Sequence, residues 1–122
     1  MSPFNKVTID YLTRHDATGD YALYLVEPAG WSDLDARLHK LQDRIYTAVD
    51  ALLDGQIASD YPDSKGTFVR IKIVFLGQDA PERAVQMIDR LYAYVNESPE
   101  HAPAGVSRGL ISGLAITHSI TG

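Results

Sequence analysis

The sequence of 122 residues contains no cysteine, which excludes disulfide bonds, thiolate metal sites, iron–sulfur clusters and a cysteine nucleophile. Basic residues are also scarce, because 11 Lys and Arg side chains stand against 16 Asp and Glu and give a formal net charge of −5. A chain this acidic is poorly suited to the phosphate backbone of nucleic acids, so we expect no nucleic-acid partner. Long apolar runs are missing too: they reach only a few residues, whereas a membrane span needs roughly 20.

These absences favour a soluble protein of the cytoplasm that is not associated with a membrane. The N-terminal residues show no basic segment followed by an apolar stretch of the signal-peptide kind. The histidines include no pair at metal-ligand spacing on one helix, and no loop has the acidic pattern of a calcium site, so we expect neither a metal nor another cofactor. With 45% hydrophobic and 22% charged residues, the composition is that of a single domain over residues 1–122.

Hydrophobic periodicity predicts four strands and two helices. Apolar and polar residues alternate over 6–12, 68–76 and 114–120, and the segment 21–27 forms the remaining strand. A long amphipathic helix begins at Ser32 and ends before Gly55, where a left-handed cap is expected. A second helix begins around Pro81 and buries a face that reaches Val95. The segment 99–113 is rich in glycine and proline, which favours a loop.

The order of these elements, β-β-α-β-α-β, predicts an α+β fold, a two-layer α/β sandwich in which a four-stranded sheet packs against one layer of helices. Only a short polar stretch joins the first two strands, so we expect an antiparallel hairpin there and a largely antiparallel sheet overall. Each helix has one dominant apolar stripe, so both helices should lie on one face of the sheet. Ile71 and Ile73 should be buried beneath them.

Four short motifs resemble those of a small bacterial family of unknown function. They are Trp31 after the expected hairpin, Leu41-Gln42-Asp43-Arg44 on the first helix, Gly55-Gln56 at its end and Tyr61-Pro62 before the third strand. The resemblance covers residues 7–76 and implies the order strand, strand, Trp, helix, Gly-Gln, Tyr-Pro, strand. No activity is established for that family, so the resemblance implies no catalytic residue.

The leading functional hypothesis is a small non-enzymatic interaction domain that forms a homodimer and can also bind another protein. The sheet face away from the helices should combine apolar side chains, Leu12 among them, with Tyr24, Arg70 and Lys72, a mixture common at modest interfaces. Two copies could pack these faces around a two-fold axis. Alternatively, the apolar stripes of the helices provide the contact, or the segment 99–113 folds over the open face and leaves a monomer.

Two other functions remain open on the sequence. A small hydrolase or isomerase could use His15 and His118 as acid–base groups if the first and last strands lie side by side. An anion-binding or small-molecule-binding module could instead use Ser107 and Arg108 together with backbone amides of the glycine-rich segment. Whether the two imidazole rings converge on one concave pocket separates the enzyme hypothesis from the interaction domain.

Overall fold

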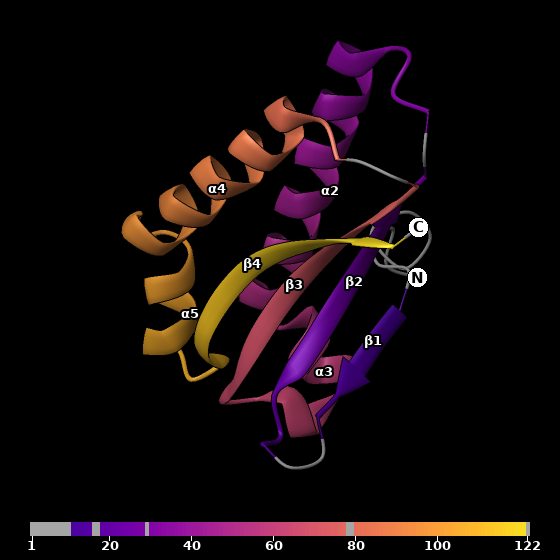
Figure 1. The fold of residues 1–122 in the computed structure, drawn as a ribbon. Coiled ribbons are helices and arrows are strands. Elements are labelled where there is room, and N and C mark those ends of the chain that lie inside the picture. The colour runs from indigo at the N-terminus through magenta and orange to yellow at the C-terminus, as the bar shows by residue number, and fades with distance from the viewer. Residues whose placement is uncertain (1–10, 16–17, 29, 78–79, 122) are drawn as a thin grey trace.

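The computed structural model describes residues 11–15, 18–28, 30–77 and 80–121 (Figure 1). Within these residues, four strands form one sheet in the order β1-β2-β3-β4. The elements, in chain order, are β1 (Tyr11–Arg14), β2 (Tyr21–Glu27), α2 (Leu34–Leu53), α3 (Gln56–Asp60), the 3-10 turn η1 (Pro62–Ser64), β3 (Thr67–Leu76), α4 (Glu82–Glu97), α5 (Ala102–Ser107) and β4 (Ile111–Thr121). The fold is therefore α+β, as expected, but α3 and α5 make its order more complex than β-β-α-β-α-β.

The sheet is mixed, so the expectation of a largely antiparallel sheet was wrong. β1 and β2 form the expected antiparallel hairpin, whereas β2 with β3 and β3 with β4 are parallel pairs. The connections explain the difference. Helix α2 lies between β2 and β3, and α4 lies between β3 and β4. A crossover that contains a helix returns the chain to the same end of the sheet, so the next strand runs parallel to the last.

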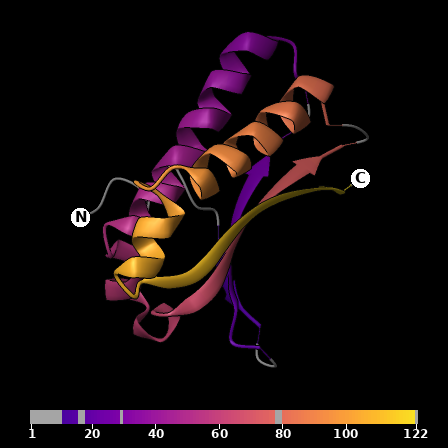
Figure 2. The ribbon, with the colours of Figure 1, turned by 90° about the vertical axis from the view of Figure 1, so that its left-hand side faces the viewer.

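The helices of the described residues lie on one face of the sheet, as expected for the two long ones (Figure 2). From β2 to β4 the chain steps across the sheet in one direction, and two crossovers of the same hand in one direction place their helices on the same side. Buried side chains of the strands and helices form an apolar cluster between the two layers. Ile71 and Ile73 belong to it and have no exposed surface, as expected.

The side chains of the first strand lie on the opposite faces of the sheet from those that the sequence predicted. Leu12 pairs with Leu23 and packs, partly buried, against the apolar cluster on the helix side of the sheet. It was expected on the open face, and a shift of one residue in a strand moves every side chain to the opposite face. Residues 6–10 of the expected strand lie outside the described residues.

Helix α2 begins and ends close to the expected positions. Asp33, not Ser32, is its N-cap, and the Asp33 carboxylate accepts a hydrogen bond from the backbone N–H of Ala36 at 3.4 Å. Gly55 follows the helix with a φ of 83°, the left-handed conformation expected there. The last turn of α2 contains no basic residue, so a cation that stabilises its carbonyl groups has to come from elsewhere in the chain.

The segment 99–113 is not a loop throughout, because it contains α5. Pro103 lies in the first turn of α5, where the missing N–H removes no helical hydrogen bond. Gly105 lies so close to α2 that an added Cβ would be 2.6 Å from Cδ2 of Leu53 and 3.1 Å from Cγ1 of Ile111. The residues that favoured a loop in the sequence thus begin a short helix and allow it to approach its neighbours closely.

Candidate functional site

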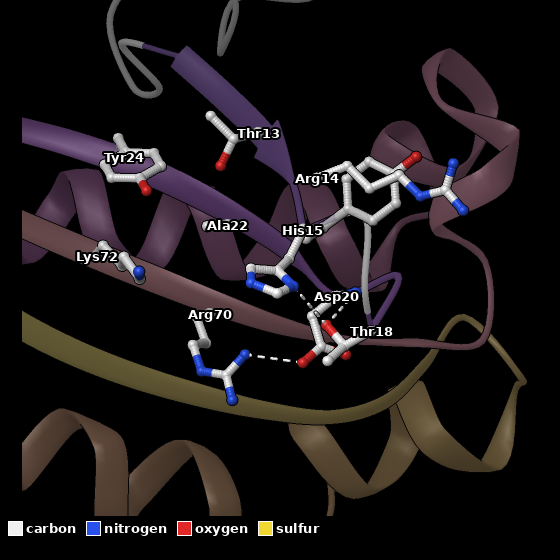
Figure 3. A pocket seen from close by; sticks show the side chains of 10 residues that line it. Thr13, Arg14, His15, Thr18, Asp20, Ala22, Tyr24, Arg70 and Lys72 are labelled. Carbon is white, nitrogen blue, oxygen red and sulfur yellow. Dashed lines mark hydrogen bonds and ion pairs between the residues drawn. The ribbon is translucent and has the colours of Figure 1, made fainter.

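A hollow of about 370 Å³ lies beside the turn between β1 and β2 (Figure 3), and we call it the hairpin pocket. It opens on the face of the sheet that the helices leave uncovered. Its lining residues come from β1, the turn, β2 and β3: Thr13, Arg14, His15, Thr18, Asp20, Tyr21, Ala22, Tyr24, Arg70 and Lys72.

The register of the strands explains why a hollow forms at this place. Thr13, Ala22 and Arg70 are partners across β1, β2 and β3, and Tyr24 pairs with Lys72 in the next row. Side chains that are partners across a sheet project from the same face. Two small side chains therefore lie next to a long arginine, and the row beyond them holds two large ones. Thr13 and Ala22 therefore form the floor of the pocket.

The turn between β1 and β2 forms one wall of the pocket. The backbone N–H of His15 donates to the carbonyl oxygen of Asp20 at 2.8 Å, and the N–H of Gly19 donates to the carbonyl of His15 at 2.7 Å. The hydroxyl of Thr18 lies 3.3 Å from Nδ1 of His15 and accepts from the N–H of Asp20 at 3.3 Å. These contacts place the imidazole at the rim of the pocket and the Asp20 carboxylate toward β3 (Figure 3).

Strand β3 supplies two cations to the pocket. Nη1 of Arg70 donates to Oδ2 of Asp20 at 3.0 Å, and the guanidinium carbon lies 4.8 Å from the centre of the Phe68 ring. Nζ of Lys72 lies 5.6 Å from the centre of the Tyr24 ring. A guanidinium has five N–H donors, so a bond to one carboxylate oxygen leaves donors for a ligand. The Arg70 side chain is 42% exposed, which leaves it accessible from solvent.

The pocket is positively charged in an acidic chain. Two fixed cations, Arg70 and Lys72, line it beside one carboxylate, that of Asp20, whereas Arg14, the partner of the buried Tyr21, points away from it (Figure 3). The chain as a whole has a net charge of −5. The field at a site depends on the charges around it, so the pocket is more positive than the net charge of the chain suggests.

The sequence pointed to some of these residues. Tyr24, Arg70 and Lys72 were expected on one sheet face, and they line one pocket. Asp20 was not expected there, because its approach to β3 depends on how the three strands are aligned. The only sequence signal for it is a polar turn between two strands, and such a turn carries no information about which neighbouring strand it faces.

Ser107 and Arg108 lie apart from the hairpin pocket, at the end of α5. Nη1 of Arg108 donates to the carbonyl oxygen of Leu53 at 2.5 Å. It thus supplies the cation that the last turn of α2 lacks, which is a favourable place for positive charge. This contact gives Arg108 a structural role, and the anion site expected around these two residues stays a prediction.

His15 and His118 do not converge on one pocket. His15 directly follows β1, and His118 lies on β4. These are the two edge strands of the sheet, so they are not neighbours. His118 is the partner of Ile73, and its ring lies 6.3 Å from that of Phe75, centre to centre, whereas His15 lines the hairpin pocket. The geometry gives no support to an acid–base pair formed by these two rings.

A second hollow, of about 380 Å³, lies between α2 and α4. Two of its charged residues are already paired, since Arg83 Nη1 lies 3.0 Å from Oδ1 of Asp35, and both side chains are largely exposed. An exposed pair of this kind is held weakly and competes with any ligand for the arginine. The hairpin pocket is therefore the stronger candidate.

Two residues of the family motifs surround a buried carboxylate at the end of β2. Glu27 is 5% exposed and forms ion pairs with Arg44 and, at 3.3 Å, with Arg37. The Arg37 guanidinium lies 3.8 Å from the centre of the Trp31 ring, which in turn packs against Phe75 at 5.7 Å. The cluster joins the end of β2 to α2, so these motif residues stabilise the fold.

The fold and the hairpin pocket define a two-layer α+β domain with a cationic hollow on its open sheet face. The chain belongs to the family of unknown function DUF6572, which it matches over residues 1–102. This match confirms the resemblance to a family of unknown function. No curated protein and no solved structure matches the chain. The described residues contain no group of three or more His, Cys, Asp or Glu side chains suited to a metal ion, and no helix among them is long and apolar enough to cross a membrane.

Proposed function

We propose that this protein is a non-enzymatic interaction domain that holds an anionic group of its partner, a carboxylate or a phosphate, in the hairpin pocket. One observation supports the proposal above all: Arg70 and Lys72 border a floor of small side chains on an uncovered sheet face. The binding residues are thus Tyr24, Arg70 and Lys72, which the sequence suggested, together with residues of the β1–β2 turn.

The donors in the pocket match an anion better than a neutral ligand. Hydrogen bonds from guanidinium or ammonium groups to carboxylate or phosphate are roughly twice as strong as bonds between neutral groups. Asp20 holds one side of the Arg70 guanidinium and thereby orients it. It does not neutralise the pocket, because Lys72 lines the same space. An anion placed above Ala22 therefore meets a net positive surface.

The open face makes the pocket accessible to another protein. Parallel strands are usually covered by helices on both faces, but the described residues cover only one face of this sheet. A partner can therefore approach the pocket without displacing a helix. A second copy of the chain suits this face less well, since a two-fold axis through it would bring two positively charged pockets together. We therefore assign the open face to an acidic partner.

The test is an NMR titration of the chain with inorganic phosphate and, separately, with a glutamate-rich peptide. Backbone amides around Tyr24 and Lys72 should shift with at least one probe, and binding should weaken as salt is added. Lys72→Gln should weaken binding about tenfold, which corresponds to about 1.4 kcal/mol. Lys40→Gln is the matched control, because Lys40 is an exposed lysine on α2, away from the pocket.

The outcomes separate the sources of the anion. Binding of phosphate without the peptide points to a small-molecule ligand, and tighter binding of the peptide points to a protein partner. The proposal is wrong if neither probe shifts these amides. It is also wrong if Lys40→Gln weakens binding as much as Lys72→Gln does, because the interaction would then depend only on overall charge.

A further inference from the structure

The outer edge of β4 differs from the protected edges of most sheets. β4 is the last strand in the order, so it pairs with β3 on one side and has no strand on the other among the described residues. Edge strands usually carry lysine, proline or other features that prevent pairing with a second chain. Residues 111–121 contain no proline and no Asp, Glu, Lys or Arg. The edge is thus a suitable template for a further strand.

The second half of β4 extends beyond the helical layer. All side chains from Thr117 to Thr121 are exposed, although Ile73 and Phe75, the partners of His118 and Ile120 on β3, are fully buried. Ile120 is 49% exposed, which makes it one of the large apolar side chains left in contact with water. This half of the strand is therefore accessible along its backbone as well as on both faces.

One hydrogen bond shows which backbone groups of β4 face outward. The carbonyl oxygen of Thr121 accepts from the N–H of Gly77, the residue after β3, at 2.9 Å. The N–H and C=O groups of successive residues in a strand point alternately to its two sides. The N–H and C=O groups of Ile116, His118 and Ile120 therefore face away from β3, toward the edge.

We propose that two copies of this chain dimerise through β4, which pairs antiparallel with its own copy and joins the two sheets into one. A further extended strand can bond to the whole row of outward N–H and C=O groups at once, in place of water. A second copy fits because a two-fold axis places the segment 117–121 against itself, and this segment has no charged side chain to repel its own copy. The pairing also brings the exposed Ile120 side chains to the interface.

This dimer does not depend on the function proposed for the open face. The hairpin pocket is formed by β1, the turn, β2 and β3, so pairing at the outer edge of β4 leaves it accessible in both copies. The two proposals can therefore fail separately. Loss of anion binding says nothing about the dimer, and a monomer can still bind an anion.

Disulfide trapping tests the geometry directly, because the chain has no cysteine of its own. Single cysteines are introduced at each position from 116 to 120, and Thr13→Cys on β1 is the control at the other edge. In an antiparallel two-fold pair, one residue lies on the axis opposite its own copy, within the Cα separation of about 4.4–6.8 Å that a disulfide needs. For a residue two positions along the strand from the axis, the Cα atom lies roughly 13 Å from the Cα atom of the same residue in the other copy.

One position between 116 and 120 should therefore cross-link at least about tenfold faster than its neighbours and than Thr13→Cys. Light scattering of the unmodified chain should show a mass that rises to that of a dimer with concentration. Ser119→Lys should shift the equilibrium toward monomer by about tenfold, because it places two lysines near the axis. Ser59→Lys on the exposed surface of α3 should not. Circular dichroism confirms that each variant is folded.

A monomer at every concentration overturns the proposal. A dimer that cross-links at Thr13→Cys as fast as at any position on β4, or at the same rate along 116–120, also overturns it, because the interface then lies elsewhere. A dimer with one fast position on β4, weakened by Ser119→Lys alone, supports it.

Discussion

Replacing Ile71 by alanine tests the arrangement of the two layers most directly. Ile71 is fully buried on the central strand β3. It lies in register between Leu23 of β2, which is also fully buried, and Ile116 of β4, which is 5% exposed. Removing the side chain loses its transfer free energy and leaves a cavity, which together cost about 2–5 kcal/mol.

The upper half of that range applies here. A cavity costs least where its walls can move inward, but hydrogen-bonded strands fix both sides of Ile71 and the helices lie above it. We therefore expect Ile71→Ala to lose about 3–5 kcal/mol of unfolding free energy. The neighbouring Arg70→Ala removes a partly exposed side chain and one ion pair, so it should cost no more than about 1 kcal/mol.

Urea denaturation followed by circular dichroism measures both variants. With an m-value of about 2 kcal/mol/M, a loss of about 4 kcal/mol lowers the midpoint by roughly 2 M, whereas Arg70→Ala should shift it by less than about 0.5 M. The m-values should stay unchanged, since both variants expose the same surface on unfolding. If Arg70→Ala proved the more damaging, the assignment of the two faces of β3 would be reversed.

Three further changes test particular contacts. Arg44→Ala removes one partner of the buried Glu27 carboxylate and should cost about 3 kcal/mol in urea denaturation; Arg83→Ala, which breaks an exposed ion pair, should stay within about 1 kcal/mol. Gly105→Ala gains helix propensity of about 0.5–1 kcal/mol, but the new Cβ is too close to α2 and overpacking costs about 1–3 kcal/mol, so the melting temperature should fall. Partial burial raises the pKa of Asp50, so its ionised form disfavours the native state. Asp50→Asn should therefore raise the melting temperature at pH 7. This gain should vanish once the pH falls below 3.8, where the carboxyl is protonated in both the folded and the unfolded state.

The sequence predicted the strands and the long helices better than it predicted their directions. Alternation along residues 68–76 is more typical of antiparallel strands than of parallel ones, because parallel strands are usually buried on both faces and lose their alternation. Here only one face is covered, so Arg70 and Lys72 alternate with fully buried residues in a parallel strand. The better indicator was the helix between each pair of later strands, since a connection of that length is the usual route to a parallel neighbour.

Local chemistry also misled the interpretation of the last forty residues. Pro103 and Gly105 are typical of loops. Here Pro103 lies in the first turn of α5 and Gly105 on the face that contacts α2, an arrangement that depends on the position of α2. The contact of Arg108 with the carbonyl of Leu53 could not be predicted either, because the two residues are far apart in sequence. Part of the hairpin pocket could be predicted from the sequence, since Arg70 and Lys72 share a strand face. Its wall could not be predicted, because it depends on the tertiary alignment of β1, β2 and β3.

The parallel pairing of β3 with β4 also affects how the chain folds as it is made. β3 is one of the two interior strands of the sheet, yet its partner β4 is synthesised only after α4 and α5. Ribosomes add roughly 5–20 residues per second, so the apolar strand β3 leaves the ribosome with one edge unpaired for a time on the order of seconds. During that interval it is open to pairing with other nascent chains. The charge-free strand β4 then pairs with β3 and ends this exposure, so this edge of β3 is open to aggregation only until β4 has been synthesised.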